Sequence, residues 1–96
     1  MEKKKLTITD NQMKGLEVLQ VVNKSICSKE LITKHKELVN EKGFDTKKVN
    51  AINATLASLV LKGLANKEIK QFEDKLLTHY SLNEKGLSFL NNEENE

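Results

Sequence analysis

The sequence contains no arginine, no proline and no tryptophan, and it has a single cysteine among its 96 residues. One cysteine excludes a framework of internal disulfides and fits a reducing, cytoplasmic compartment. All sixteen cationic side chains are lysine. Any basic surface therefore lacks the rigid two-pronged guanidinium that contacts guanine or phosphate through paired hydrogen bonds.

Long apolar segments are also missing. No run approaches the roughly 20 apolar residues of a membrane-spanning helix. The opening MEKKKLTITD is basic but lacks the apolar stretch of a signal peptide. With 38% hydrophobic and 31% charged residues, the chain can still form one compact domain. We therefore expect a cytoplasmic protein without a membrane partner.

The net charge of +2 is unevenly distributed along the chain. Residues 1–83 hold fifteen lysines and ten acidic residues, which gives +5, whereas residues 84–96 carry −3. The composition predicts an arm over 1–8, a domain over 9–90 and a disordered acidic tail over 91–96. A basic domain is compatible with binding a polyanion.

Two helices are predicted in the first half of the chain. Thr9 and Gln12 match a capping box, and apolar residues then follow at helical spacing until about Asn23. Residues 25–28 form a short link with room for one β-bridge. Ser28 is the expected N-cap of a second helix over about 29–41, which Gly43 ends.

A third helix is predicted over about 46–62, with Asp45 or Thr46 as its N-cap and Gly63 after its end. At 100° per residue, one face is apolar: Val49, Ile52, Leu56, Leu59 and Val60. The opposite face is small and polar: Lys47, Asn50, Ala51, Ala54 and Ser58.

After Gly63 the apolar pattern changes from helical spacing to alternation. Residues 64–71 and 76–82 are predicted to be strands joined by a turn at 72–74, which makes a β-hairpin. Asn83 then caps a short last helix. The elements therefore follow one another as three helices, a hairpin and a final helix.

This order of elements resembles a winged helix-turn-helix domain. Two local sequence motifs are similar to those of winged helices of the MarR type (multiple antibiotic resistance regulator). The stretch LVLKGL at 59–64 resembles the end of a recognition helix and the entry to the wing. Asp74-Lys75 and YSLNEKG at 80–86 resemble the return of the wing and the motif after it. The resemblance implies a mainly α fold with a small β-hairpin wing (α+β): a three-helix core, a two-stranded wing and a short C-terminal helix.

The chain departs from the MarR-type pattern in three places. The segment from Leu31 to Ile52 is about ten residues longer than a compact helix-turn-helix. Lys75 and Leu76 stand near the wing tip, where the family usually carries an arginine. The long flanking helices through which that family dimerises are not expected from this sequence, so we expect a homodimer to need another surface.

The resemblance implies a small transcriptional regulator of a bacterium, phage or plasmid that binds double-stranded DNA. The third helix would enter the major groove, where Asn50 could pair with adenine and Ala51 or Ala54 could touch a thymine methyl. Without arginine, A·T-rich sites are expected. The candidate DNA contacts are Ser28, Lys29, Lys47, Lys48, Asn50, Ala51, Asn53, Ala54, Ser58, Lys67, Lys70 and Lys75.

Two other functions are compatible with a winged-helix fold. Winged helices also bind proteins, and an exposed apolar patch at Leu61, Phe72 or Leu76 would favour an adaptor without DNA binding. A ligand sensor would need a pocket, for which a chain of this length has little room. No paired carboxylates, nucleophile motif or glycine-rich phosphate loop indicates an enzyme or a cofactor.

A metal site is not expected from the sequence. The spacing of Cys27, His35 and His79 matches no zinc pattern. Cys27 is instead expected to be a small buried residue, His35 to lie at the edge of an apolar stripe, and His79 to point outward from the wing.

Overall fold

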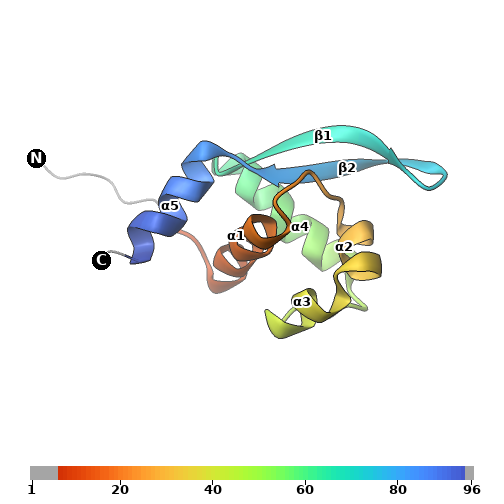
Figure 1. Ribbon diagram of the computed structural model, residues 1–96, viewed down its shortest axis with the longest axis horizontal. Helices are drawn as coiled ribbons and strands as arrows, with labels where there is room; N and C mark the ends of the chain where they lie inside the picture. Colours follow the sequence, from red (N-terminus) through yellow and green to blue (C-terminus); the bar gives the residue numbers. More distant parts are fainter. Residues whose placement is uncertain (1–6, 95–96) are drawn as a thin grey trace, which may run out of the picture.

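The computed structural model describes residues 7–94, which form five helices and one antiparallel hairpin. The order is α1 (Asp10–Val22), α2 (Ser28–Lys34), α3 (Lys36–Glu41), α4 (Val49–Leu61), β1 (Ala65–Phe72), β2 (Lys75–Leu82) and α5 (Glu84–Glu94). Figure 1 shows the hairpin running along one side of the helices, with its turn beyond α2 and with α5 at the opposite end. The predicted α+β class is confirmed, and the topology is consistent with a winged helix.

Helix α1 begins as the sequence predicts. The Thr9 hydroxyl accepts a hydrogen bond from the Gln12 backbone N–H at 3.1 Å, and the Gln12 side chain accepts one from the Thr9 N–H at 2.9 Å. These reciprocal bonds satisfy two N–H groups that a helix start leaves without partners. The helix ends at Asn23, which adopts the left-handed conformation.

The predicted helix over 29–41 is wrong as a single element, because the chain breaks at His35 into α2 and α3. His35 leaves the helical region at φ −129° and ψ 38°. In a straight helix, Leu31 and Val39 would be about 12 Å apart along the axis. The break allows both side chains to reach the same small core, where each is about 1% exposed. The N-cap of α2 is also Cys27 rather than Ser28.

Helix α4 begins at Val49, three residues later than predicted. Asp45 caps a tight turn instead, because its carboxylate accepts from the Lys47 N–H and its carbonyl accepts from the Lys48 N–H, both at 2.9 Å. Lys47 and Lys48 therefore precede the helix. The predicted apolar face is confirmed at Ile52, Leu56 and Leu59, whereas Val49 is 36% exposed.

The hairpin is confirmed, with Ala65 opposite Leu82 and Phe72 opposite Lys75 across a turn of two residues. On its far side, β2 forms the single bridge that the sequence allowed for. The backbones of Ile26 and Tyr80 exchange two hydrogen bonds, of 2.9 and 2.8 Å. The helices are thus tied to the inner half of the wing.

The core lies where α1, α2 and α4 meet the base of the wing. Its largest fully buried side chains include Leu16, Leu19, Ile26, Leu31, Leu56 and Leu59. Helix α5 continues to Glu94 and so enters the segment 91–96 that the sequence predicts to be disordered. The rest of that segment, and residues 1–6 of the predicted arm, lie outside the described residues.

The base of the wing and the start of α5 are joined through Asn83. Its side-chain amide donates to the Gly63 carbonyl at 3.0 Å, and its side-chain oxygen accepts from the Gly86 N–H at 2.8 Å. Gly86 lies against Leu64, since an added Cβ would stand 2.2 Å from the Leu64 carbonyl oxygen. This close approach of two backbones explains the glycine in the YSLNEKG motif.

We expect Gly86→Ala to lower the free energy of unfolding by about 1–3 kcal/mol, because the new methyl group meets rigid backbone. Urea denaturation followed by circular dichroism measures this change. Ser88→Ala is the matched control at an exposed position of the same helix, with an expected change within about 0.5 kcal/mol. Equal stability of the two variants would contradict the close packing at Gly86.

Candidate nucleic-acid interface

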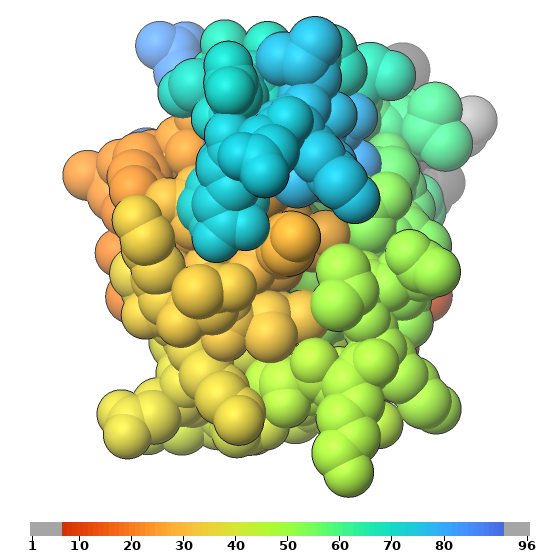
Figure 2. All heavy atoms as spheres, turned by 90° about the vertical axis from the view of Figure 1, so that its right-hand side faces the viewer, coloured from red at the N-terminus to blue at the C-terminus, as the bar shows by residue number. Residues whose placement is uncertain are grey.

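A groove opens on the face that carries the wing tip and the first turns of α2 and α4. Three segments line it: residues 27–29 at the start of α2, Val49, Asn50 and Asn53 in α4, and residues 75–78 in β2. Its volume is about 350 Å³. Figure 2 shows this face, with the wing tip in cyan above the start of α2 in orange and the start of α4 in light green.

Five of the twelve predicted contacts line this groove although they come from three distant segments: Ser28, Lys29, Asn50, Asn53 and Lys75. A neighbouring hollow of about 410 Å³ adds three more: Lys47, Lys48 and Ala51. The two hollows share Val49 and Asn50, so the eight residues form one surface, which we call the groove face.

Four predicted contacts lie outside the groove face: Ala54, Ser58, Lys67 and Lys70. Ala54 is exposed on α4, and the two lysines are exposed on β1. Ser58 is half-buried at the contact between α1 and α4, where it accepts from the Gln12 side chain at 2.8 Å and donates to the Thr55 carbonyl at 2.6 Å. Its hydroxyl thus serves helix packing.

Lys29 connects the start of α2 to the wing turn through an ion pair with Glu73, at 3.7 Å. Both side chains are at least half exposed, so this pair contributes little to stability and releases the lysine easily to another anion. Ser28, in contrast to Lys29, is only 6% exposed, so little of its surface is accessible from the groove.

The two asparagines of α4 have different surroundings. Asn50 is exposed at the groove, whereas the side-chain oxygen of Asn53 accepts a hydrogen bond from the Tyr80 hydroxyl at 3.0 Å. That bond joins the middle of α4 to the inner part of the wing. Asn50 is therefore free to meet a ligand, and Asn53 principally positions the wing.

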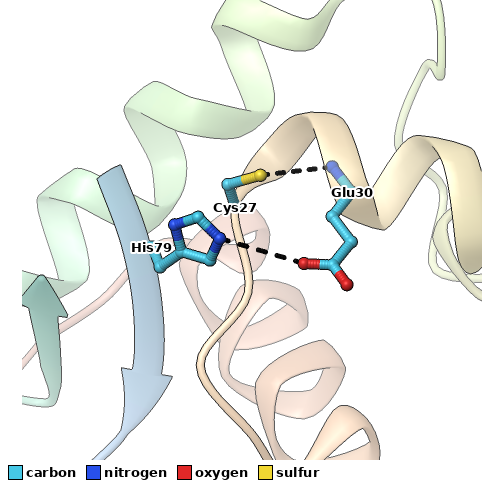
Figure 3. A group of neighbouring side chains, drawn as sticks. All are labelled: Cys27, Glu30 and His79. Carbon is cyan, nitrogen blue, oxygen red and sulfur yellow. Dashed lines mark hydrogen bonds and ion pairs between the residues drawn. The ribbon is translucent and has the colours of Figure 1, made fainter. Parts of the chain in front are cut away.

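Behind the groove lies a buried polar cluster that sequence reasoning did not find. Cys27, Glu30 and His79 are 2%, 7% and 3% exposed, and Figure 3 shows them pointing toward one another. The expectation that Cys27 is buried is confirmed. The expectation that His79 points outward from the wing is wrong, because β2 lies against α2 at this register. The spacing of Cys27 and Glu30, one helical turn apart, was the available signal.

The Tyr80 hydroxyl is a partly buried titratable group that is bonded to Asn53 of the groove. Burial raises the pKa of its hydroxyl above the usual 10.0, and the hydrogen bond to Asn53 partly offsets that rise. The folded protein therefore favours the neutral phenol, so this group's contribution to stability is complete below pH 10 and is lost as the pH rises through the folded pKa.

The fold defines a winged-helix-like module. Comparison with known proteins finds no matching family model, no matching curated protein and no matching solved structure for this chain. Within residues 7–94, none of the helices has the length and apolar character needed to cross a membrane.

We expect the Tyr80 hydroxyl to titrate above pH 10 in the folded protein, because burial disfavours the phenolate. Tyr80 is the only tyrosine and tryptophan is absent, so phenolate absorption reports this group alone. The urea-unfolded chain is the reference, with a midpoint near 10. Identical midpoints in the folded and unfolded chain would contradict the buried position of the hydroxyl.

Proposed function

We propose that this protein binds double-stranded DNA through the groove face and acts by binding, as a small transcriptional regulator. The observation that supports it is the convergence of residues 28–29, 47–51 and 75 on one hollowed surface. These residues come from three segments that are distant in the sequence, and they lie together beside the exposed start of α4.

In this proposal the first turn of α4 enters the major groove, as recognition helices do. Asn50 supplies an amide that can donate to and accept from adenine, and the methyl groups of Ala51 and Ala54 suit contact with thymine. Lys47 and Lys48 stand just before the helix, where the phosphates that border the DNA major groove would lie. Because lysine lacks the bidentate geometry that reads guanine, A·T-rich sites are preferred.

The wing then follows the DNA backbone. Lys75 lines the groove face near the wing tip, and Lys67 and Lys70 are exposed along β1. Lysine contacts with phosphate position a protein without reading sequence, so they make binding strongly dependent on salt. The chain is expected to combine modest specificity with steep salt dependence.

A second candidate is an adaptor that binds a protein. Two leucines favour it, since Leu61 at the end of α4 is 88% exposed and Leu76 near the wing tip is 71% exposed. Leu76 lines the same groove, so an apolar partner could use this surface as well. Selection of bound sequences from random duplex DNA separates the two candidates, because an adaptor enriches none.

We expect the selected duplexes to be A·T-rich and their affinity to fall steeply between 50 and 200 mM salt, as lysine–phosphate contacts require. Asn50→Ala should weaken the preferred site by about tenfold while affecting random DNA little. Lys47→Ala should weaken all sequences alike and reduce the salt slope by about one. Fluorescence anisotropy with labelled duplexes measures both effects.

Lys85→Ala is the matched control, because it removes one exposed charge from α5, at the opposite end of the molecule (Figure 1). If it weakened DNA binding as much as Lys47→Ala, attraction would come from overall charge and the groove face would have no special role. Absence of salt-sensitive binding at micromolar protein would exclude DNA as the ligand.

A further inference from the structure

The cluster behind the groove brings together three side chains that are all metal ligands in proteins. Cys27 caps α2, Glu30 lies in the first turn of α2, and His79 comes from β2. One donor atom from each, a sulfur, a carboxylate oxygen and a ring nitrogen, lies within 4.8 Å of the other two. In Figure 3 the three side chains approach one another between helix and strand.

The orientation of His79 leaves a lone pair directed at Glu30. Its Nδ1 lies 2.9 Å from the Leu77 carbonyl oxygen, which can only accept, so Nδ1 carries a proton. In the neutral ring, Nε2 then has a lone pair, and it lies 3.9 Å from the Glu30 Oε1. That distance is too long for a hydrogen bond. Two acceptors thus face each other across a gap that a cation would fill.

The second carboxylate oxygen of Glu30 is held from the outside. Lys24 and Lys34 place their ammonium groups 3.3 and 3.7 Å from Oε2, which leaves Oε1 directed inward. A backbone carbonyl on the far nitrogen of a histidine and charged partners on a carboxylate are the outer contacts that orient metal ligands. The cluster therefore has both an inner donor set and its supporting contacts.

The geometry points to a binding site for one divalent cation of the zinc class, held by Cys27 Sγ, Glu30 Oε1 and His79 Nε2. Tetrahedral zinc places such donors about 3.3–3.6 Å apart. The donor atoms here lie within 4.8 Å of one another, so the cluster needs to contract by up to about 1.2 Å. Three protein ligands leave the fourth position to water. On binding, Cys27 releases its thiol proton to solvent, and the thiolate and carboxylate balance the charge of the ion.

Such an ion would join α2 to β2, next to the bridge by which Ile26, two residues before α2, pairs with Tyr80. It would fix β2 to α2 at the rear of the groove, which Cys27 also lines. The site depends on these three side chains and not on any DNA contact, so it stands apart from the function proposed above.

Titration of the reduced, metal-free full chain with Co²⁺ tests the site directly. We expect a near-ultraviolet band from charge transfer between thiolate and cobalt, visible bands of a four-coordinate ion, a ratio of one ion per chain, and loss of both signals on adding Zn²⁺. The chain has one cysteine, so the band reports Cys27 alone. No such band with the folded wild-type chain would overturn the proposal.

Variants then identify the ligands. Zn²⁺ should raise the thermal unfolding midpoint of the wild type and of His35→Gln, because an ion that binds the folded state stabilises it. His79→Gln and Cys27→Ser should lose this shift and bind Co²⁺ at least tenfold more weakly. His35→Gln is the matched control, since it removes the only other histidine. An equal zinc shift in His35→Gln and His79→Gln would overturn the assignment.

A test in the wild type alone remains decisive if the buried variants do not fold. Zn²⁺ should slow the reaction of Cys27 with a thiol reagent at least tenfold at metal concentrations that do not change the helix content. An unchanged rate under saturating zinc would show that Cys27 is not a ligand, and the cluster would then be an ion pair that secures the wing.

Discussion

The two hydrogen bonds between Ile26 and Tyr80 determine how the wing is attached to the helices. A two-stranded hairpin is marginal by itself in water, and this bridge gives β2 a partner on its second edge. It also sets the register of the wing: Tyr80 reaches Asn53 of α4, and His79 on the other face meets Glu30 of α2. A register shift of one residue would exchange these two side chains and remove both contacts. The groove face and the buried cluster depend on the same bridge.

Much of the fold follows from local sequence signals. The capping box at Thr9, the change from helical spacing to alternation after Gly63 and the asparagine before α5 each act within a few residues, and each element they predict is present. Two of the errors in helix bounds have different causes, one in tertiary packing and one in a local turn. The apolar stripe of 31–39 is compatible with a straight helix, but the chain bends at His35, and with this bend Leu31 and Val39 are both buried in the core. Asp45 satisfies a turn and leaves α4 to begin at Val49.

Part of the candidate site could be predicted from the sequence. Exposed residues near element starts, such as Lys29, Lys47 and Asn50, can be placed on one face from the order of elements, and the structure brings them together at the groove. The burial of His79 could not be deduced, because strand alternation does not say which face of a hairpin meets another element when both faces carry polar residues. The spacing of Cys27 and Glu30 indicated that these two side chains are neighbours, but it could not indicate His79, which lies 49 positions after Glu30 in the chain. The resemblance to MarR-type wings likewise gave no reason to expect a buried histidine there.

The outer edge of β1 is open to pairing with another strand. In residues 7–94, β1 pairs only with β2, so its other edge presents unpaired backbone groups over a strand that is exposed from Asn66 to Gln71. Such an edge is a template on which a second chain can add a strand and begin aggregation. Lys67, Glu68 and Lys70 interrupt it with charge, and Ile69 is the only apolar side chain among those exposed positions. The wing lysines thus oppose pairing of this edge with another chain, and removing them to probe a ligand would also remove this protection.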